Sequence, residues 1–156
     1  MRKIFALGTS SLPLLFGLFI DYQMTHKVLF GFKLTLICLT FAAFWFICGM
    51  MLNMFKLKKH ELIIGGNTVS IIFFIYIMVQ LLFLDGLSNN HFGALAEVNF
   101  LPMVSVVRFI DIFNIVNSSP MTFVFSFIMY IFTFGLGVHL GSESRRVDEM
   151  RGIYER

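Results

Sequence analysis

Long apolar runs alternate with short polar segments along this chain. The apolar runs cover residues 4–20, 30–55, 62–84 and 121–140. A helix needs about 20 apolar residues to cross the hydrocarbon core of a bilayer. The last three runs reach that length and the first is slightly short. The pattern therefore predicts four transmembrane helices.

Composition favours the same class. Hydrophobic residues make up 58% of the 156 residues, charged residues only 13%, and the mean hydropathy is +0.84. A soluble domain carries about 25% charged residues because its surface faces water. We therefore predict an all-α integral membrane protein whose main partner is the lipid bilayer. The net charge of +3 fits loops that face an anionic leaflet and gives no reason to expect a nucleic-acid partner.

The first apolar run follows Arg2 and Lys3, as the apolar region of a signal peptide does. No small-residue cleavage site follows it, since the chain continues from Asp21 into Tyr22. An uncleaved helix is therefore the better interpretation, with a mild bend at Pro13.

Basic residues indicate the orientation. A four-pass arrangement with the N-terminus inside places nine of the twelve basic residues on the cytoplasmic side, in the N-terminus, the 56–61 loop and the tail. It leaves only Lys27, Lys33 and Arg108 outside. This asymmetry obeys the positive-inside rule. We expect an up-down bundle over residues 1–141 in a cell membrane, and a charged cytoplasmic tail over 142–156 that extends the last helix.

The outer loop over residues 85–120 is the longest segment between runs. Its first part, residues 86–99, is polar and rich in turn-forming residues, whereas residues 100–116 are mostly apolar. We expect a helix over 101–116 that lies in the outer interface or is re-entrant and packs against the other helices. A fifth span is the alternative. It would bury Arg108 and Asp111 near mid-membrane and move the arginine-rich tail outside, against the charge rule.

This loop also holds the candidate interaction residues, which are Arg108, Asp111, Glu97 and His91. Flanked by aromatic and aliphatic residues, they suit contact with a lipid headgroup, a peptide or the outer face of a partner. The competing interpretation is an ion pair between Arg108 and Asp111, three residues apart on one helix, that serves only the helix itself.

Small residues mark the last helix as a packing surface. Gly137 and Gly141 form a GxxxG pattern, which Gly135 extends upstream. Such spacing lets two helix backbones approach closely. We expect this face to contact another helix of the bundle, with Gly65 and Gly66 as partners, another membrane protein or a second copy of the chain.

Cofactor chemistry has little support. Cys38 and Cys48 are ten residues apart, about 15 Å along a helix, too far for a disulfide or a shared metal. His60 and His139 are a weak pair for haem, and zinc-binding spacings are missing. We therefore predict no cofactor. Uncharged polar residues within the runs, such as Asn67, suit hydrogen bonds between helices.

One segment bears a short resemblance to a known family. Residues 97–102, Glu-Val-Asn-Phe-Leu-Pro, resemble the outer-face Asn-Leu-Ile-Pro-Phe signature of the VanZ-like small membrane proteins. Met103 stands where that signature has Phe, and the Asn-rich start of the family's next helix is missing from Met121 onward. The resemblance covers this segment alone and implies no functional residues.

Three functions remain open from the sequence. The first is a non-enzymatic accessory, immunity or envelope-associated interaction protein of a bacterial cytoplasmic membrane, which the scarcity of catalytic groups favours. The second is a small transporter or channel that forms its pathway by oligomerisation. The third is a membrane enzyme that acts on lipid or peptide at the outer face.

Overall fold

The computed structural model describes residues 2–26, 32–53, 58–83, 91–110 and 119–154. Nearly all of these residues are helical, and no strand occurs among them. The helices are α1 (Arg2–Thr9), α2 (Leu12–Thr25), α3 (Phe32–Leu52), α4 (Lys59–Phe83), α5 (His91–Ile110) and α6 (Ser119–Tyr154). Four segments are long and apolar enough to span a membrane: Ile4–Thr25, Phe32–Leu52, Lys59–Phe83 and Pro120–Arg146.

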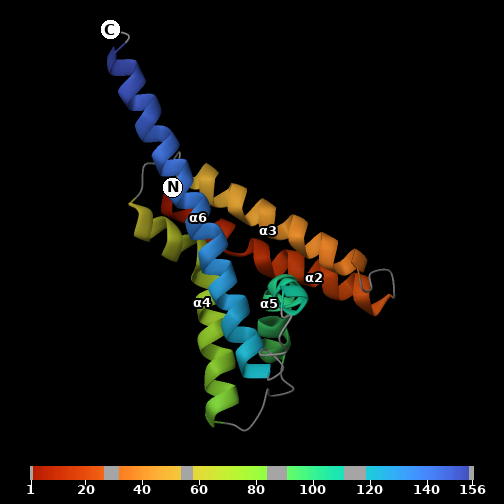
Figure 1. The fold of residues 1–156 in the computed structure, drawn as a ribbon. Helices are drawn as coiled ribbons and strands as arrows, with labels where there is room; N and C mark the ends of the chain where they lie inside the picture. Colours follow the sequence, from red (N-terminus) through yellow and green to blue (C-terminus); the bar gives the residue numbers. More distant parts are fainter. Residues whose placement is uncertain (1, 27–31, 54–57, 84–90, 111–118, 155–156) are drawn as a thin grey trace.

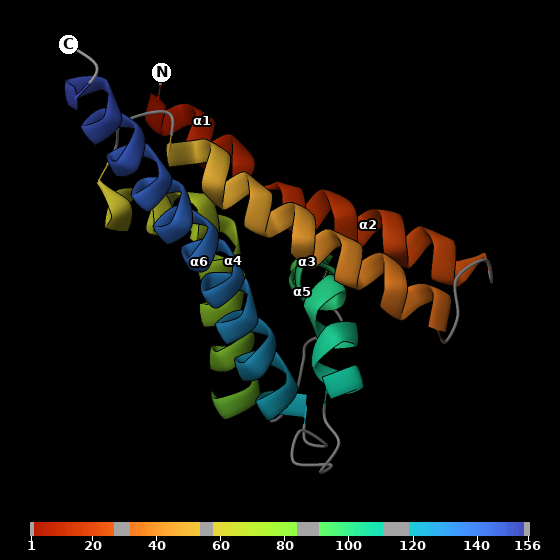
Figure 2. The same cartoon turned by 45° about the horizontal axis from the view of Figure 1, so that its top comes forward.

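The helices form two groups that cross at a wide angle (Figures 1 and 2). One group contains α2 and α3, and the other contains α4 and α6. The groups meet where α3 packs on α6, and they diverge away from that crossing. Helix α5 lies between them and packs against α2, α3, α4 and α6. The fold is therefore a wedge of two helix pairs with α5 inside it.

Helix α5 corrects one prediction from the sequence. Residues 86–99 were expected to form a polar loop, but the helix already begins at His91. The buried positions of α5 recur every three or four residues, as expected for one face of a helix. That face is fully or nearly fully buried, and it consists of Gly93, Ala96, Asn99, Phe100, Met103, Val106 and Val107. Burial of this stripe stabilises the helix despite its polar start.

The N-terminal span is broken, where a mild bend at Pro13 had been predicted. Helix α1 ends at Thr9 and α2 begins at Leu12. Pro13 lies in the first turn of α2 and has no N–H for the carbonyl of Thr9. The hydroxyls of Ser10 and Ser11 donate to the carbonyls of Leu7 and Gly8. These side chains therefore compete with the backbone N–H groups for the carbonyls that a continuous helix would use.

Helix ends differ from the predicted runs by a few residues. Helix α2 continues five residues past Ile20, and α4 begins three residues before Leu62. Helix α6 continues through the charged tail to Tyr154, in agreement with the predicted extension. Residues 30–31, 54–55 and 84, at the predicted run ends, lie outside the described part of the chain.

Glycines allow α3 and α6 to approach each other closely. Added Cβ atoms on Gly137 and Gly49 would collide with the backbone carbonyls of Phe46 and Phe134, so α3 and α6 cross backbone to backbone. A Cβ on Gly141 would lie 2.8 Å from the carbonyl oxygen of Met50. The GxxxG face thus packs on α3 of the same chain.

Gly65 and Gly66, the expected partners of the GxxxG face, have other neighbours. Gly66 makes room for the ring of Phe134, and Gly65 lies beside Ala6 of α1. Among the described residues, a Cβ added to Gly135 would meet the side chain of Ile63, at 3.7 Å. The tight crossing therefore uses Gly137 and Gly141 without Gly135.

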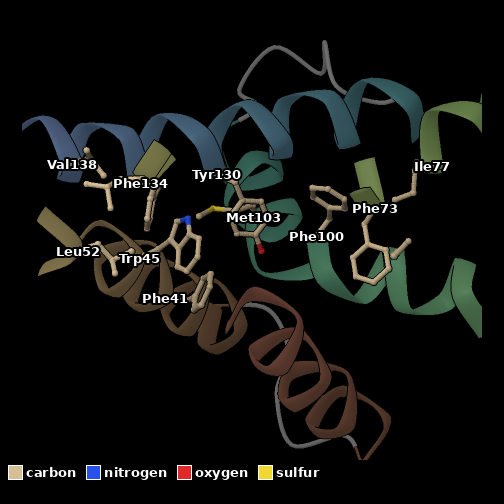
Figure 3. Packing of buried hydrophobic residues seen from close by; sticks show 12 residues of the cluster. Phe41, Trp45, Leu52, Phe73, Ile77, Phe100, Met103, Tyr130, Phe134 and Val138 are labelled. Atoms are coloured by element: carbon tan, nitrogen blue, oxygen red, sulfur yellow. The ribbon is translucent and has the colours of Figure 1, made fainter. Parts of the chain in front are cut away.

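Aromatic rings fill the space between the two groups (Figure 3). Trp45 of α3 lies edge-on to Tyr130 of α6, with ring centroids 6.2 Å apart, and 4.9 Å from the ring of Phe134. Phe100 of α5 meets Tyr130 at 5.8 Å. Met103 lies beside Trp45 and Tyr130 in Figure 3. Close packing of this kind holds helices together where lipid removes the hydrophobic driving force.

Candidate functional site

A buried polar cluster joins three helices at the centre of the fold. Asn99 of α5 donates from Nδ2 to the hydroxyl of Ser70 on α4, at 3.2 Å. The hydroxyl of Tyr130 on α6 donates to the backbone carbonyl of Asn99, at 2.7 Å. All three residues are fully buried. These bonds fix α5 against both helices of the α4–α6 pair.

Other polar atoms close to this level have no hydrogen-bond partner among the described residues. They are Trp45 Nε1, Asn67 Oδ1 and Asn99 Oδ1. Asn67 uses its amide nitrogen to donate to the carbonyl of Ile63 in its own helix, at 2.9 Å. Amides, hydroxyls and an indole are neutral groups, so the cluster positions helices and supplies no strong acid or base.

Sequence reasoning found only part of this cluster. Polar residues within the apolar runs were expected to form hydrogen bonds between helices. Ser70 does so by accepting from Asn99, whereas the amide nitrogen of Asn67 donates within its own helix. Asn99 was placed in a loop, so its pairing with Ser70 was missed. The three- and four-residue spacing of apolar positions from Ala96 through Met103 was the signal that could have placed Asn99 on a helix.

The predicted outer-face residues are not brought together by the described structure. His91 is exposed in the first turn of α5, and Glu97 is exposed further along the same helix. Arg108 lies near the end of α5, with its side chain outside the described part, and Asp111 lies outside the described residues altogether. The expected pairing of Arg108 with Asp111 stays a prediction.

Glu97 stands out by its position along the fold. Its neighbour Asn99 meets Ser70, which lies close to the midpoint of Lys59–Phe83. Its neighbour Val98 meets Gly17, where a Cβ would collide with the Val98 carbonyl, well inside Ile4–Thr25. The exposed carboxylate of Glu97 thus lies on the part of α5 that packs against the middle of Lys59–Phe83 and the inner part of Ile4–Thr25.

Pro102 explains why α2 approaches so closely there. Proline has no N–H, so the carbonyl of Val98 four residues earlier lacks its normal helical donor. Gly17 has no side chain, and its backbone lies against that carbonyl. Helix α5 also changes direction along its length in Figures 1 and 2, as expected for a helix with an internal proline.

A second polar region lies at the end where α3 finishes and α4 begins. Lys59 donates to Nδ1 of His139, at 3.3 Å, and its Nζ lies 3.7 Å from a carboxylate oxygen of Glu143. Asn53 donates to the carbonyl of Val138, and Arg145 donates to the carbonyl of Asn53, at 3.2 Å. The described residues hold no group of three His, Cys, Asp or Glu side chains that could bind a metal ion.

Comparison with protein-family models, with curated proteins and with solved structures finds no match for this chain. The short resemblance over residues 97–102 therefore places the chain in no family.

Proposed function

We propose that this protein spans a bacterial cell membrane four times, with both termini in the cytoplasm. The distribution of basic residues supports this topology. One end of the fold holds four basic residues, Lys58, Lys59, Arg145 and Arg146. Helix α1, which begins at Arg2, lies beside the start of α4 at the same end (Figure 1). Basic residues at one end of apolar helices mark the cytoplasmic side.

Within that membrane, we propose that the protein is a non-enzymatic accessory subunit that binds another membrane protein through α5. The observation that carries the proposal is Glu97, an exposed carboxylate level with the middle of the spans. An ionised side chain at such a depth costs about 3 kcal/mol or more, and such residues usually pair with an opposite charge. A lysine, arginine or histidine on a transmembrane helix of a partner would remove this cost.

Exposed side chains near Glu97 on α5 support this helix as the contact surface. Ala94, three residues before Glu97, is exposed on the same face of α5, and Phe92 and Leu95 are exposed elsewhere on the first half of this helix. By contrast, the GxxxG face of α6 already packs on α3, so Gly137 and Gly141 are not available for a second copy. We therefore place the partner contact on α5 rather than on the last helix.

The test is co-purification of the full-length protein in mild detergent. Wild-type protein should retain a stoichiometric membrane partner that carries a basic residue within a span. Glu97→Gln should lose most of that partner, roughly tenfold if one ion pair of 1–2 kcal/mol is removed. Asp21→Asn removes another exposed carboxylate, on α2, and should leave recovery unchanged.

A charge exchange makes the test specific. Glu97→Lys should abolish binding, and replacing the partner's basic residue by Glu should restore it. Equal partner recovery with wild-type and Glu97→Gln protein would overturn the proposal.

A small transporter is the second candidate, because two observations favour it. Glu97 is an intramembrane carboxylate under the topology above, and the first span is broken at Ser10 and Ser11. Carboxylates and broken helices within the membrane are typical of ion-coupled carriers. This candidate predicts a defined homo-oligomer and proton or cation flux in liposomes that Glu97→Gln abolishes. The accessory proposal predicts no such flux.

A further inference from the structure

The charged end of the fold contains a polar hollow with a volume of about 230 Å³. Its wall comes from the start of α4 and from the stretch of α6 just after the apolar part. The lining residues are Lys59, Ser142, Glu143, Arg145 and Arg146. Three cations and one carboxylate therefore face a single hollow.

The contacts in this region hold the cations in place. Glu143 and His139 both bind the ammonium of Lys59, so this side chain is held close to α6. Arg145 is anchored by its bond to the carbonyl of Asn53. The lining side chains carry three positive charges and one negative charge, a balance that suits an anion.

The hollow lies at the boundary between polar and apolar surface. On α6, an exposed apolar stripe of Phe132, Leu136 and Leu140 leads directly to Glu143, because residues three and four apart lie on one face of a helix. On α4, Ile64 is exposed little more than one turn after Lys59. Apolar surface for an acyl chain thus continues from a cationic hollow for a headgroup.

We propose that this hollow binds the phosphate headgroup of an anionic phospholipid from the leaflet at the charged end. Lys59 and Arg146 would contact the phosphate, and the acyl chain would lie on the α6 stripe. Basic pockets between helices at the membrane surface recognise anionic headgroups in this way. The site is separate from Glu97 and does not depend on the proposed partner.

Native mass spectrometry of the full-length protein in neutral detergent tests the proposal. Phosphatidylglycerol should remain bound in preference to phosphatidylcholine. Lys59→Gln and Arg146→Gln should each weaken phosphatidylglycerol binding about fivefold. Glu143→Gln should strengthen it, because the competing carboxylate is removed.

Two controls make the result decisive. Lys33→Gln removes an exposed basic residue at the start of α3, far along the chain from the hollow, and should leave binding unchanged. Glycerol phosphate, which has the headgroup chemistry without acyl chains, should bind much more weakly than the lipid. Equal binding of both phospholipids, an equal effect of Lys33→Gln, or glycerol phosphate binding as strong as lipid binding would overturn the proposal.

Discussion

Asn99 of α5 is hydrogen-bonded to both α4 and α6. Its side chain reaches Ser70 and its backbone carbonyl accepts from Tyr130. Hydrogen bonds between helices in membranes contribute about 0.6 kcal/mol on average and up to about 1.7 kcal/mol. The contribution of each bond is therefore modest, and its main effect is to fix which face of α5 points inward.

Replacing Tyr130 by Phe tests that bond. The change removes one hydroxyl and keeps the ring that packs against Trp45 and Phe100. We expect Tyr130→Phe to lower the free energy of unfolding by about 0.5–1.5 kcal/mol. Denaturation in mixed micelles measures it.

Tyr22→Phe is the matched control, because Tyr22 is exposed and the same atom is removed. Its effect should stay within about 0.5 kcal/mol. If Tyr130→Phe lies in that range too, the bond to the Asn99 carbonyl is not a determinant of the fold.

Helix α6 shows how an element uses glycines two residues apart for different purposes. Gly137 lies against the backbone of α3, whereas Gly135 faces a flexible isoleucine side chain. A methyl group can displace the end of a side chain at little cost, but it cannot displace a helix backbone. The same substitution should therefore have opposite effects at the two positions.

Gly137→Ala should lower the free energy of unfolding by about 1–3 kcal/mol, because the new Cβ forces α3 and α6 apart. Gly135→Ala should be neutral or stabilising by up to about 1 kcal/mol, through better helix propensity. Thermal unfolding of both variants in the same detergent makes the comparison. Equal destabilisation at both positions would contradict the crossing described above.

At the scale of the element, the sequence predicted the long helices and the second half of α5, but it missed that α5 already begins at His91. Runs such as residues 62–84 exceed the length that hydrocarbon requires, so their pattern alone predicts helix. The start of α5 carries Gly93 and polar residues, whose local preferences favour a turn. Only the burial of Ala96 and Phe100 against other helices overrides that preference.

The whole molecule is two helix pairs opened around α5. If the chain enters and leaves the membrane on the same side at α5, the number of full spans stays four. The alternative with a fifth span would move the tail after Gly141 to the outer side.

Reporter fusions distinguish the two topologies. A phosphatase fused after residue 87, between α4 and α5, should be active, because it lies outside. Fusions after Lys58 and after residue 156 should be inactive as phosphatase and fluorescent as a cytoplasmic reporter. An active phosphatase at the C-terminus would establish the fifth span and contradict the proposed topology.

The amino-acid sequence by itself determined that the chain is helical, which segments have span-like length and where basic residues cluster. These properties depend on composition over a window, and each residue adds to them independently of its distant neighbours. Tertiary structure decided that α5 is an inner helix, that the GxxxG face meets α3, and that Asn99 finds Ser70. Such pairings depend on which surfaces fit together across long stretches of chain, and periodicity carries no information about the partner.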